Sequence, residues 1–269
     1  MADATHYVIR GGVEGRERLR VLGRVMHGTS AALFARLGWG EGLACLDAGC
    51  GGGDVTLTLA RLVGARGRVV GVDIDETKLA IARDEARQLG MTNVDFRTFD
   101  LRDQPADGEF DVVYARFLLT HLSDPAAALR TMFASLRPGG QIALEDIDFS
   151  GHFTYPRSDA FDRYHALYCA TVTRRGGDPN IGPRLPLLLR KTGFADVGVN
   201  VVQPVAMTGE TKLINPLTME NIAASVLEDG LATREEIDRI VRQLYDDAAD
   251  VDTVAGCPRV VQAWGRRPA

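Results

Sequence analysis

The spacing of hydrophobic residues changes between helical and strand-like along the chain. Residues 13–37 place apolar side chains at near-helical intervals, and Gly28-Thr29-Ser30 is expected to divide this stretch into two helices. From residue 43 onward, short apolar runs alternate with longer amphipathic stretches. The runs predict strands at residues 43–48, 69–72, 94–99, 110–115 and 141–147. The stretches predict helices at residues 54–63 and 76–89, and a third helix after the fourth strand.

Capping signals set the ends of these helices. Gly90 is placed to end the second one in the left-handed conformation. Ser123 or Asp124 is expected to cap the third, with Pro125 in its first turn, and Pro138-Gly139-Gly140 to end it. Further along, helices are predicted at residues 158–173, 184–192 and most of 216–250, and strands at 197–205 and 260–264.

Repeated alternation of strand and helix implies an α/β fold. The predicted elements form a Rossmann-like, doubly wound and mostly parallel sheet of seven strands, covered on both faces. Ligands of such sheets bind beyond the carboxyl ends of the strands. Asp47, Asp73 and Asp100 stand at or beside three of these ends, and Asp146 and Asp148 stand near a fourth. The sequence therefore predicts an acidic ligand-binding rim.

Composition excludes several classes of protein. The net charge is −5 and no basic stripe is present, so nucleic acid is not expected as a partner. No apolar run is long enough to cross a membrane, and the first ten residues do not look like a secretory signal. The four cysteines form no CxxC pair, so we expect reduced thiols, no metal site and a cytoplasmic protein.

The glycine-rich loop from Asp47 to Asp54 is the most informative segment. Its third fingerprint position is Asp54, whereas a dinucleotide-binding loop has glycine there. A pyrophosphate would be repelled by the carboxylates of Asp47 and Asp54, but the ammonium and sulfonium groups of S-adenosylmethionine would be attracted. The charge pattern favours this cofactor over NAD. A purely structural turn is the alternative.

Two acidic residues further along stand where they could bind the nucleoside part of such a cofactor. Asp73 follows the second strand, where an acidic side chain accepts hydrogen bonds from both ribose hydroxyls of a nucleotide. The alternative role is a helix N-cap, for which Asp75 is better placed. Asp100, at the end of the third strand, could accept the adenine amino group, or it could be a solvated loop residue.

Several motifs together resemble those of a known family. The segments are LDAGCGGG (46–53), GVDID (71–75), DFRTFDL (95–101), FDVVYARFLLTHLSDP (110–125) and LRPGGQIALEDID (136–148). In this order they resemble class I S-adenosylmethionine-dependent methyltransferases of the small-molecule type. They are similar to the group that includes the menaquinone and ubiquinone biosynthesis methyltransferases. The segment VVQAWGRRP (260–268) fits the antiparallel last strand of that family.

The resemblance implies a set of cofactor-binding residues. Asp47 and the loop residues hold the methionyl group, Asp73 the ribose, and Asp100 with Leu101 the adenine. Arg116 and Phe117 line the pocket, and Tyr7 belongs to a segment that folds over the cofactor. The full predicted set is Tyr7, Asp47, Gly49, Cys50, Gly51, Asp73, Ile74, Lys78, Asp100, Leu101, Arg116 and Phe117.

The chain is interpreted as a single domain, residues 1–269. Its expected parts are N-terminal helices (1–40), a cofactor-binding core (41–148) and helical lid insertions over the acceptor site (149–180 and 209–258). The aromatic residues of the first insertion could roof an apolar acceptor pocket or pack as the core of a lid. They are Phe149, Phe153, Tyr155, Tyr164 and Tyr168.

Methyl transfer from a sulfonium needs in-line placement of the acceptor and exclusion of water, and a base only when the acceptor must lose a proton. His121 is the candidate base, just beyond the fourth strand; His152 and His165 are weaker candidates. If His121 is the base, the rate should rise with pH near the usual pKa of histidine. The alternative is that His121 orders the loop before the next helix.

The predicted function is transfer of a methyl group from S-adenosylmethionine to a small, fairly apolar acceptor, with S-adenosylhomocysteine as product. The three lysines against 28 arginines suggest a GC-rich bacterial gene, and secondary metabolism is the expected setting. Neither the acceptor nor the methylated atom (O, N or C) follows from the sequence, and a homodimer is compatible with it. The alternatives are a non-methylating rearrangement or cyclisation, a non-catalytic cofactor-binding module, and a nicotinamide dehydrogenase.

Overall fold

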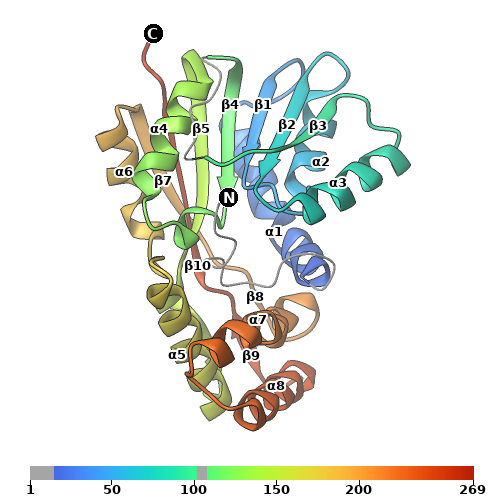
Figure 1. The fold of residues 1–269 in the computed structure, drawn as a ribbon, viewed down its shortest axis with the longest axis vertical. Coiled ribbons are helices and arrows are strands. Elements are labelled where there is room, and N and C mark those ends of the chain that lie inside the picture. The colour runs from blue at the N-terminus through green and yellow to red at the C-terminus, as the bar shows by residue number, and fades with distance from the viewer. Residues whose placement is uncertain (1–14, 102–107) are drawn as a thin grey trace.

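Seven strands form one sheet in the computed structural model, which describes residues 15–101 and 108–269 (Figure 1). The strands are β1 (Ala44–Ala48), β2 (Arg68–Asp73), β3 (Val94–Thr98), β4 (Phe110–Arg116), β5 (Leu136–Asp148), β7 (Ala195–Val202) and β10 (Arg259–Arg266). Their order is β3-β2-β1-β4-β5-β10-β7. The first five are parallel neighbours, and β10 is antiparallel to both β5 and β7. The predicted mostly parallel sheet with an antiparallel last strand is confirmed.

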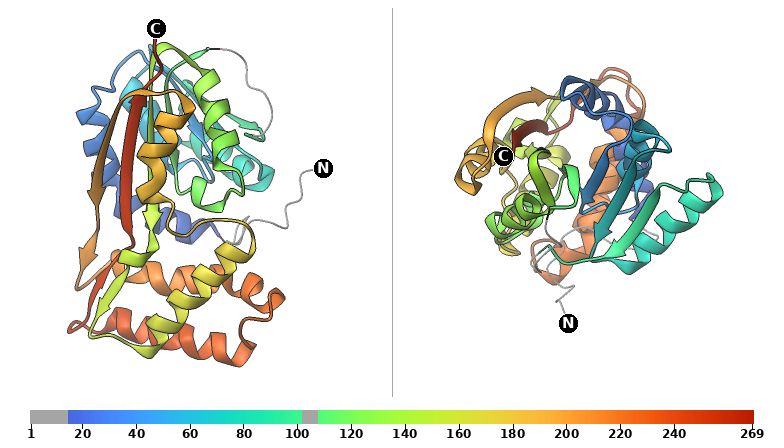
Figure 2. Two further views of the ribbon diagram at one scale, coloured as in Figure 1. Left: turned by 90° about the vertical axis from the view of Figure 1, so that its left-hand side faces the viewer. Right: turned by 90° about the horizontal axis from the view of Figure 1, so that it is seen from above.

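Helices cover both faces of this sheet. They are α1 (Arg16–Arg36), α2 (Asp54–Val63), α3 (Glu76–Gln88), α4 (Pro125–Ser135), α5 (Asp159–Arg174), α6 (Leu185–Thr192), α7 (Glu210–Glu228) and α8 (Arg234–Ala249). One apolar core joins the sheet to α1 and α2, and another joins it to α4 and α6. Figure 2 shows the sheet edge-on between these layers. All five residues of β1 are buried, as expected for a central parallel strand.

Several helix boundaries agree with the capping signals, and others do not. Helix α2 covers the predicted residues, and the Asp124 side chain caps α4 by accepting the Ala127 N–H at 2.9 Å. The predicted break of the first helix at Gly28-Thr29-Ser30 is wrong, because α1 runs through it. The Ser30 hydroxyl donates to the buried Glu145, so packing outweighs the poor helix propensity of this tripeptide.

Two later boundaries also differ from expectation. The segment Pro138-Gly139-Gly140 does not end a helix: α4 stops at Ser135, and the segment lies in the first part of β5. The strand predicted at residues 197–205 divides into β7 and β8 (Val205–Ala206). Strand β8 belongs to a small sheet with β6 (Phe153–Tyr155) and β9 (Val254–Gly256), which the spacing did not predict.

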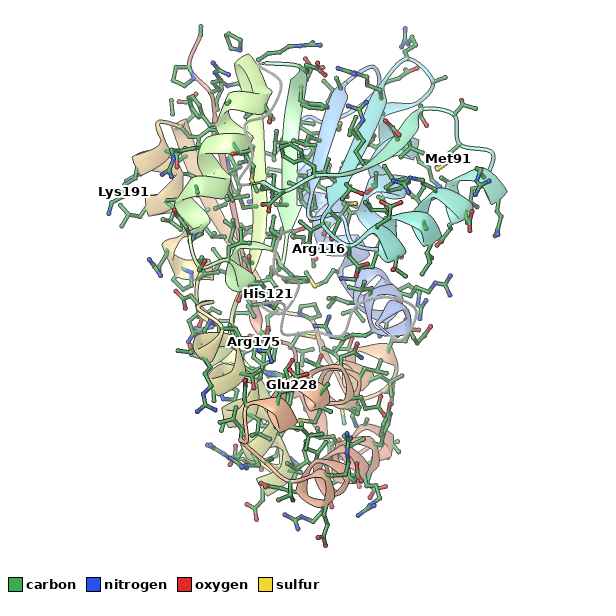
Figure 3. The ribbon with its side chains drawn as sticks, viewed as in Figure 1. Met91, Arg116, His121, Arg175, Lys191 and Glu228 are labelled. Carbon is green, nitrogen blue, oxygen red and sulfur yellow. The ribbon has the colours of Figure 1, made fainter. Side chains whose placement is uncertain are left out.

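Helices α5, α7 and α8 form a layer beyond the carboxyl ends of β1 and β4, below the sheet in the view of Figure 1. The layer has an apolar core of its own, which includes Phe149 and Tyr164. Arg175 donates to Glu228 at 3.0 Å and so links the ends of α5 and α7 (Figure 3). No helix in the described parts of the chain has the length and apolarity to cross a bilayer.

A buried polar network ties α1 to the middle of the sheet. Glu145 of β5 is fully buried and accepts hydrogen bonds from the Ser30 hydroxyl at 2.6 Å and from the Tyr114 hydroxyl. Its other oxygen accepts from Gln262 Nε2 of β10 at 2.7 Å, and Asn200 of β7 donates to Gln262 at 2.8 Å. One carboxylate therefore joins one helix and three strands directly, with β7 attached through Gln262, and its removal would take an acceptor from three buried donors.

We expect Glu145→Ala to lower the free energy of unfolding by about 3 kcal/mol or more, because buried hydrogen-bonded carboxylates are costly to remove. Urea denaturation measures the change. Glu109→Ala is the matched control, since Glu109 pairs with Arg68 on the surface and its loss should cost about 0.5 kcal/mol or less. Similar small losses in both variants would contradict a structural role for the network.

Candidate active site

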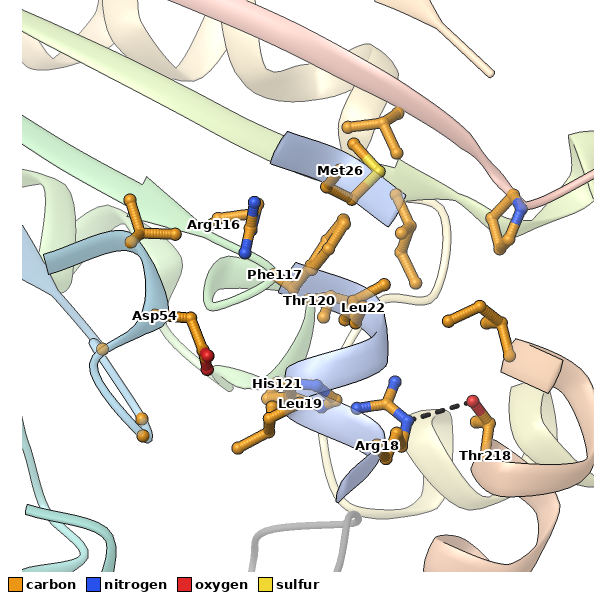
Figure 4. Close-up of a pocket in the computed structure, with 18 of the residues that line it drawn as sticks. Arg18, Leu19, Leu22, Met26, Asp54, Arg116, Phe117, Thr120, His121 and Thr218 are labelled. Atoms are coloured by element: carbon orange, nitrogen blue, oxygen red, sulfur yellow. Dashed lines mark hydrogen bonds between the residues drawn. The ribbon is translucent and has the colours of Figure 1, made fainter. Parts of the chain in front are cut away.

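One pocket opens beyond the carboxyl ends of β1, β2 and β4 (Figure 4). Its loop end is formed by the glycine loop and the carboxylates around it. Its helical end is formed by Phe149 and by residues of α5 and α7. The residues of the loop end are Asp47, Gly49, Cys50, Gly51, Gly52, Asp54 and Asp73, and those of the helical end are Phe149, Tyr164, Tyr168, Ile214 and Thr218. Residues of α1 and the turn that contains His121 lie between the two ends.

Backbone hydrogen bonds hold the glycine loop against the end of β2. The N–H groups of Gly49 and Cys50 both donate to the Val72 carbonyl, at 2.8 and 2.9 Å. The next N–H, of Gly51, donates to Asp73 Oδ2 at 2.9 Å. Gly51 has a φ of +54°, and a Cβ atom there would approach only a Leu19 methyl, at 3.6 Å. A side chain at this position would therefore occupy the pocket itself.

Three carboxylates gather at the loop end. Asp47 is buried and accepts the Thr56 hydroxyl at 2.6 Å. Burial raises the pKa of Asp47 to about 6, against the opposing effects of Thr56 and Arg116, and the negative charges of Asp73 and Asp54 raise it further. A ligand with a positive charge would relieve this repulsion. The loop end is thus suited to a cation.

Asp73 keeps part of its hydrogen-bonding capacity for a ligand. Its Oδ2 accepts the Gly51 N–H, and its Oδ1 accepts the Asp75 N–H at 3.0 Å. A carboxylate has about four lone-pair sites, so each oxygen can accept one more donor. Asp75 caps α3 by accepting the N–H groups of Thr77 and Lys78, as the sequence suggested. Asp73 is therefore not the cap of α3.

Arg116 and Phe117 form the wall between the loop end and α1. Arg116 Nη1 donates to the Ser30 hydroxyl at 3.2 Å, which connects the pocket to the buried Glu145. The guanidinium carbon of Arg116 lies 5.6 Å from the centre of the Phe117 ring. Phe117 has a φ of +54°, which is strained for a residue with a side chain, and its N–H donates to the Glu145 carbonyl at 2.8 Å.

His121 belongs to a short 3₁₀ turn, Leu119–His121, that β5 holds in place. Asp146 Oδ2 accepts the Thr120 N–H at 3.1 Å, and burial raises the pKa of Asp146 to about 7. His121 is partly buried beside the pocket. Burial, followed by the positive charges of Arg18 and Lys78, lowers the pKa of His121 to about 3. The imidazole is therefore neutral at physiological pH.

The helical end has an aromatic wall. Phe149 stacks on Tyr168 with 4.1 Å between ring centres, and Tyr164 meets Phe149 edge-on at 6.1 Å. All three line the pocket, whereas Phe153 and Tyr155 are exposed and do not. The same three residues belong to the apolar core of the helical layer, as one of the two expected roles requires, and their contact with an acceptor stays a prediction.

The two weaker histidine candidates lie behind this wall. His152 Nε2 is 2.9 Å from Asn215 Oδ1, and His165 Nε2 is 2.9 Å from the Phe149 carbonyl oxygen. Neither lines the pocket. The structure therefore brings His121, but not these two, to the ligand-binding side.

Comparison with known families agrees with this architecture. Residues 40–175, half of the chain, match the family described as "Methyltransferase domain". The chain belongs to this family.

Known relatives of this methyltransferase domain match over part of their length. The ubiquinone/menaquinone biosynthesis C-methyltransferase UbiE of Klebsiella pneumoniae is 36% identical over 126 residues, which are 46% of this chain and 49% of UbiE. The match thus spans about half the length of this curated relative.

Solved structures extend the similarity over most of the fold. The YcgJ protein of Bacillus subtilis has a TM-score of 0.61 at 16% identity and covers 90% of this chain and all of its own. The phosphoethanolamine N-methyltransferase 2 of Haemonchus contortus, solved with phosphomonomethylethanolamine and S-adenosylhomocysteine, has a TM-score of 0.58 at 19% identity. It covers 90% of this chain and 53% of its own. At these identities the similarity establishes the fold.

Most residues predicted for the site of this methyltransferase domain meet in the pocket. Those that line it are Asp47, Gly49, Cys50, Gly51, Asp73, Lys78, Arg116, Phe117 and His121. Ile74, Asp100 and Leu101 do not: Ile74 is half exposed, Asp100 is partly buried and Leu101 is in the sheet core. The predicted contact of Asp100 and Leu101 with adenine, and that of Ile74 with the cofactor, stay predictions. Tyr7 lies outside the described residues.

Sequence reasoning missed the contributions of α1, α7 and the two residues between β9 and β10. These residues are Arg18, Leu19, Leu22, Met26, Ile214, Thr218, Cys257 and Pro258. No motif contains them, and they lie far from the glycine loop in the sequence. The first helix gave one signal, an apolar stripe that includes Leu19, Leu22 and Met26. This stripe indicated that one face of the helix is buried against the rest of the protein.

The close packing of the glycine loop can be tested with a matched pair of glycines. Gly53 and Gly42 have φ angles of +82° and +87°, but only at Gly53 would a Cβ atom clash, 2.9 Å from Phe96 and 3.0 Å from Ala82. We expect Gly42→Ala to cost about 1 kcal/mol of unfolding free energy from backbone strain. Gly53→Ala should cost a further 1–3 kcal/mol, roughly, from overpacking. Equal losses by chemical denaturation would show that the loop has room there.

Proposed function

We propose that the chain transfers a methyl group from S-adenosylmethionine to a small, fairly apolar acceptor. The observation that carries the proposal is a single pocket that joins a carboxylate-rich glycine loop to an aromatic wall. One end suits a cationic nucleoside and the other an apolar molecule. His121 lies between the two ends, where the two ligands would meet (Figure 4).

The residues at the loop end fit this cofactor. The ammonium and sulfonium groups would lower the repulsion among Asp47, Asp54 and Asp73, which contributes to the raised pKa of Asp47. Gly51 leaves open the space that a Cβ atom would fill, and Asp73 has acceptor capacity for the two ribose hydroxyls. We assign Asp47 and the glycine loop to the methionyl group and Asp73 to the ribose.

When bound, S-adenosylmethionine supplies an electrophilic methyl group on a good leaving group. The chain's own residues position the two ligands and shield the reacting atoms from water. The aromatic wall orients the acceptor, and the layer of α5, α7 and α8 keeps water away from the reacting atoms. His121 is neutral, and because its lowered pKa makes it a weak base, it would take the proton of a hydroxyl or amine acceptor only as the bond to the methyl group forms and that proton becomes acidic. Carbon acceptors and anionic acceptors need no such step.

The nature of the acceptor is part of the proposal. UbiE is a C-methyltransferase of ubiquinone and menaquinone biosynthesis, but only about half of its length is matched. The aromatic wall supports a quinone-like ring or another apolar secondary metabolite of a bacterium. A cytoplasmic location, a homodimer and the single-domain organisation stay predictions.

The test combines binding with turnover. Calorimetry on the full chain should give a dissociation constant for S-adenosylhomocysteine in the micromolar range, about −8 kcal/mol, and much weaker binding of NAD. A screen of apolar acceptors should then release S-adenosylhomocysteine. Tighter binding of NAD would favour a dehydrogenase. Cofactor binding with acceptor conversion but no S-adenosylhomocysteine would indicate a rearrangement or cyclisation, and binding with no conversion a non-catalytic module.

Asp73→Ala should weaken S-adenosylhomocysteine binding by about 2–3 kcal/mol, because two hydrogen bonds to a charged acceptor are lost. Calorimetry on the folded variant measures the change. Asp75→Ala is the control: it removes the cap of α3, so it should lower stability by about 1 kcal/mol and affect binding much less. Equal binding losses in the two variants would argue against contact between Asp73 and the ribose.

If His121 is the base, His121→Ala should lower kcat about 100- to 10,000-fold with nearly unchanged cofactor affinity. Since its pKa is about 3, the neutral base is present throughout the neutral range, and the rate should stay level from about pH 5 to 8. This replaces the expectation of a rise near the usual pKa of histidine. A steep acid limb near pH 6.5 that disappears in His121→Ala would show that the working imidazole titrates normally.

A further inference from the structure

Arg18 is a buried cation without an acidic partner in the described parts of the chain. Its exposed fraction is 9%, and its Nε donates to the Thr218 hydroxyl of α7 at 3.0 Å. No ion pair joins Arg18 to a carboxylate within residues 15–101 and 108–269. Arg20 and Arg24 on the same helix do form such pairs, with Glu85 and Glu210. A buried guanidinium without a counter-charge is costly unless an anion binds there.

The guanidinium reaches from α1 to Thr218 at the helical end of the pocket. Figure 4 places it between His121 and Thr218, with Asp54 of the loop end on the other side of His121. Its charge acts on Tyr164 of the aromatic wall, where it opposes the effect of burial on the pKa of that hydroxyl. Arg116, by contrast, is the cation that acts on Asp47 at the loop end. Arg18 therefore lies near both Tyr164 of the aromatic wall and His121, and Figure 4 shows His121 between Arg18 and Asp54.

We propose that Arg18, oriented by Thr218, is the anion-binding subsite for the acceptor, and that the acceptor is an apolar aromatic molecule with a carboxylate. The proposal rests on the proposed function. Nε is engaged by Thr218, and neither Nη group has an acceptor within residues 15–101 and 108–269, so both are placed to bind the two oxygens of a carboxylate. The apolar body would lie against Phe149, Tyr164 and Tyr168.

The experiment uses a matched pair of probes, naphthoate and its neutral analogue naphthamide. Calorimetry measures the binding of each to the full chain loaded with S-adenosylhomocysteine. The native protein should prefer the acid at least about tenfold, the effect of one charge-assisted pair. Arg18→Met should reduce this preference to about twofold or less and change S-adenosylhomocysteine affinity less than about threefold. Arg20→Met, on the exposed side of α1, should leave both quantities unchanged.

The outcomes separate the subsite from the cofactor site. Binding of S-adenosylhomocysteine without any preference for naphthoate, or with no measurable naphthoate binding, overturns the subsite but not the proposed function. The carboxylate of the cofactor is the other anion that Arg18 could bind. A tenfold or larger loss of S-adenosylhomocysteine affinity in Arg18→Met, with the acid preference retained, would assign Arg18 to it and overturn the proposal.

Two further arms keep the test decisive. If the native chain binds no S-adenosylhomocysteine, the proposed function fails. Calorimetry of naphthoate and naphthamide on the free protein then still tests whether Arg18 binds a carboxylate. If Arg18→Met does not fold, Thr218→Val replaces it. That variant removes only the hydroxyl that orients the guanidinium, and it should reduce the acid preference severalfold. An unchanged preference in folded Thr218→Val would contradict the proposal.

Discussion

The attachment of the glycine loop to the end of β2 is the constraint on which the pocket depends. Three successive N–H groups, from Gly49 to Gly51, donate to the Val72 carbonyl and the Asp73 carboxylate. These bonds force backbone angles that side chains tolerate poorly, with φ of +70° at Gly49 and +54° at Gly51. Helix α2 begins directly after the loop, so the same bonds also fix where this helix enters the face of the sheet. The floor of the site and the helix beside it are thus positioned together.

Charge is distributed unevenly along the pocket. The loop end holds Asp47, Asp54 and Asp73, and the repulsion among them favours a positive ligand. The helical end holds Arg18, which lacks an acidic partner among the described residues. His121 lies between them and is kept neutral by burial and by nearby positive charge. The carboxylates favour a cationic ligand at the loop end, where Arg116 offsets part of their charge, and Arg18 favours an anionic one near Thr218.

The sequence predicted the sheet and the loop end well, because both depend on local patterns. Helix α2 has the predicted bounds, since Gly53 and Asp54 mark its start and its apolar stripe is regular. The predicted break at Gly28 was wrong because the intrinsic cost of a glycine in a helix, about 1 kcal/mol, is smaller than the packing of α1 against the sheet. Arg18 and Thr218 are 200 positions apart, so no local pattern could join them. Strand β9 has three residues and exists only through its partners.

The two ends of the pocket are built on different parts of the molecule, and this separates the recognition of their ligands. The loop end is fixed by β1, β2 and α2, whereas Tyr164, Tyr168 and Thr218 come from helices that pack on each other beyond the sheet. The layer is joined to the sheet through the Thr120–Asp178 backbone hydrogen bond of 3.0 Å and through Phe149 at the end of β5. Substitutions in α5 or α7 can therefore reshape the helical end without touching Asp47 or Asp73. The turn of His121 is held from both sides, because Thr120 donates its N–H to Asp146 of β5 and its hydroxyl to the Asp178 carbonyl of the segment that follows α5.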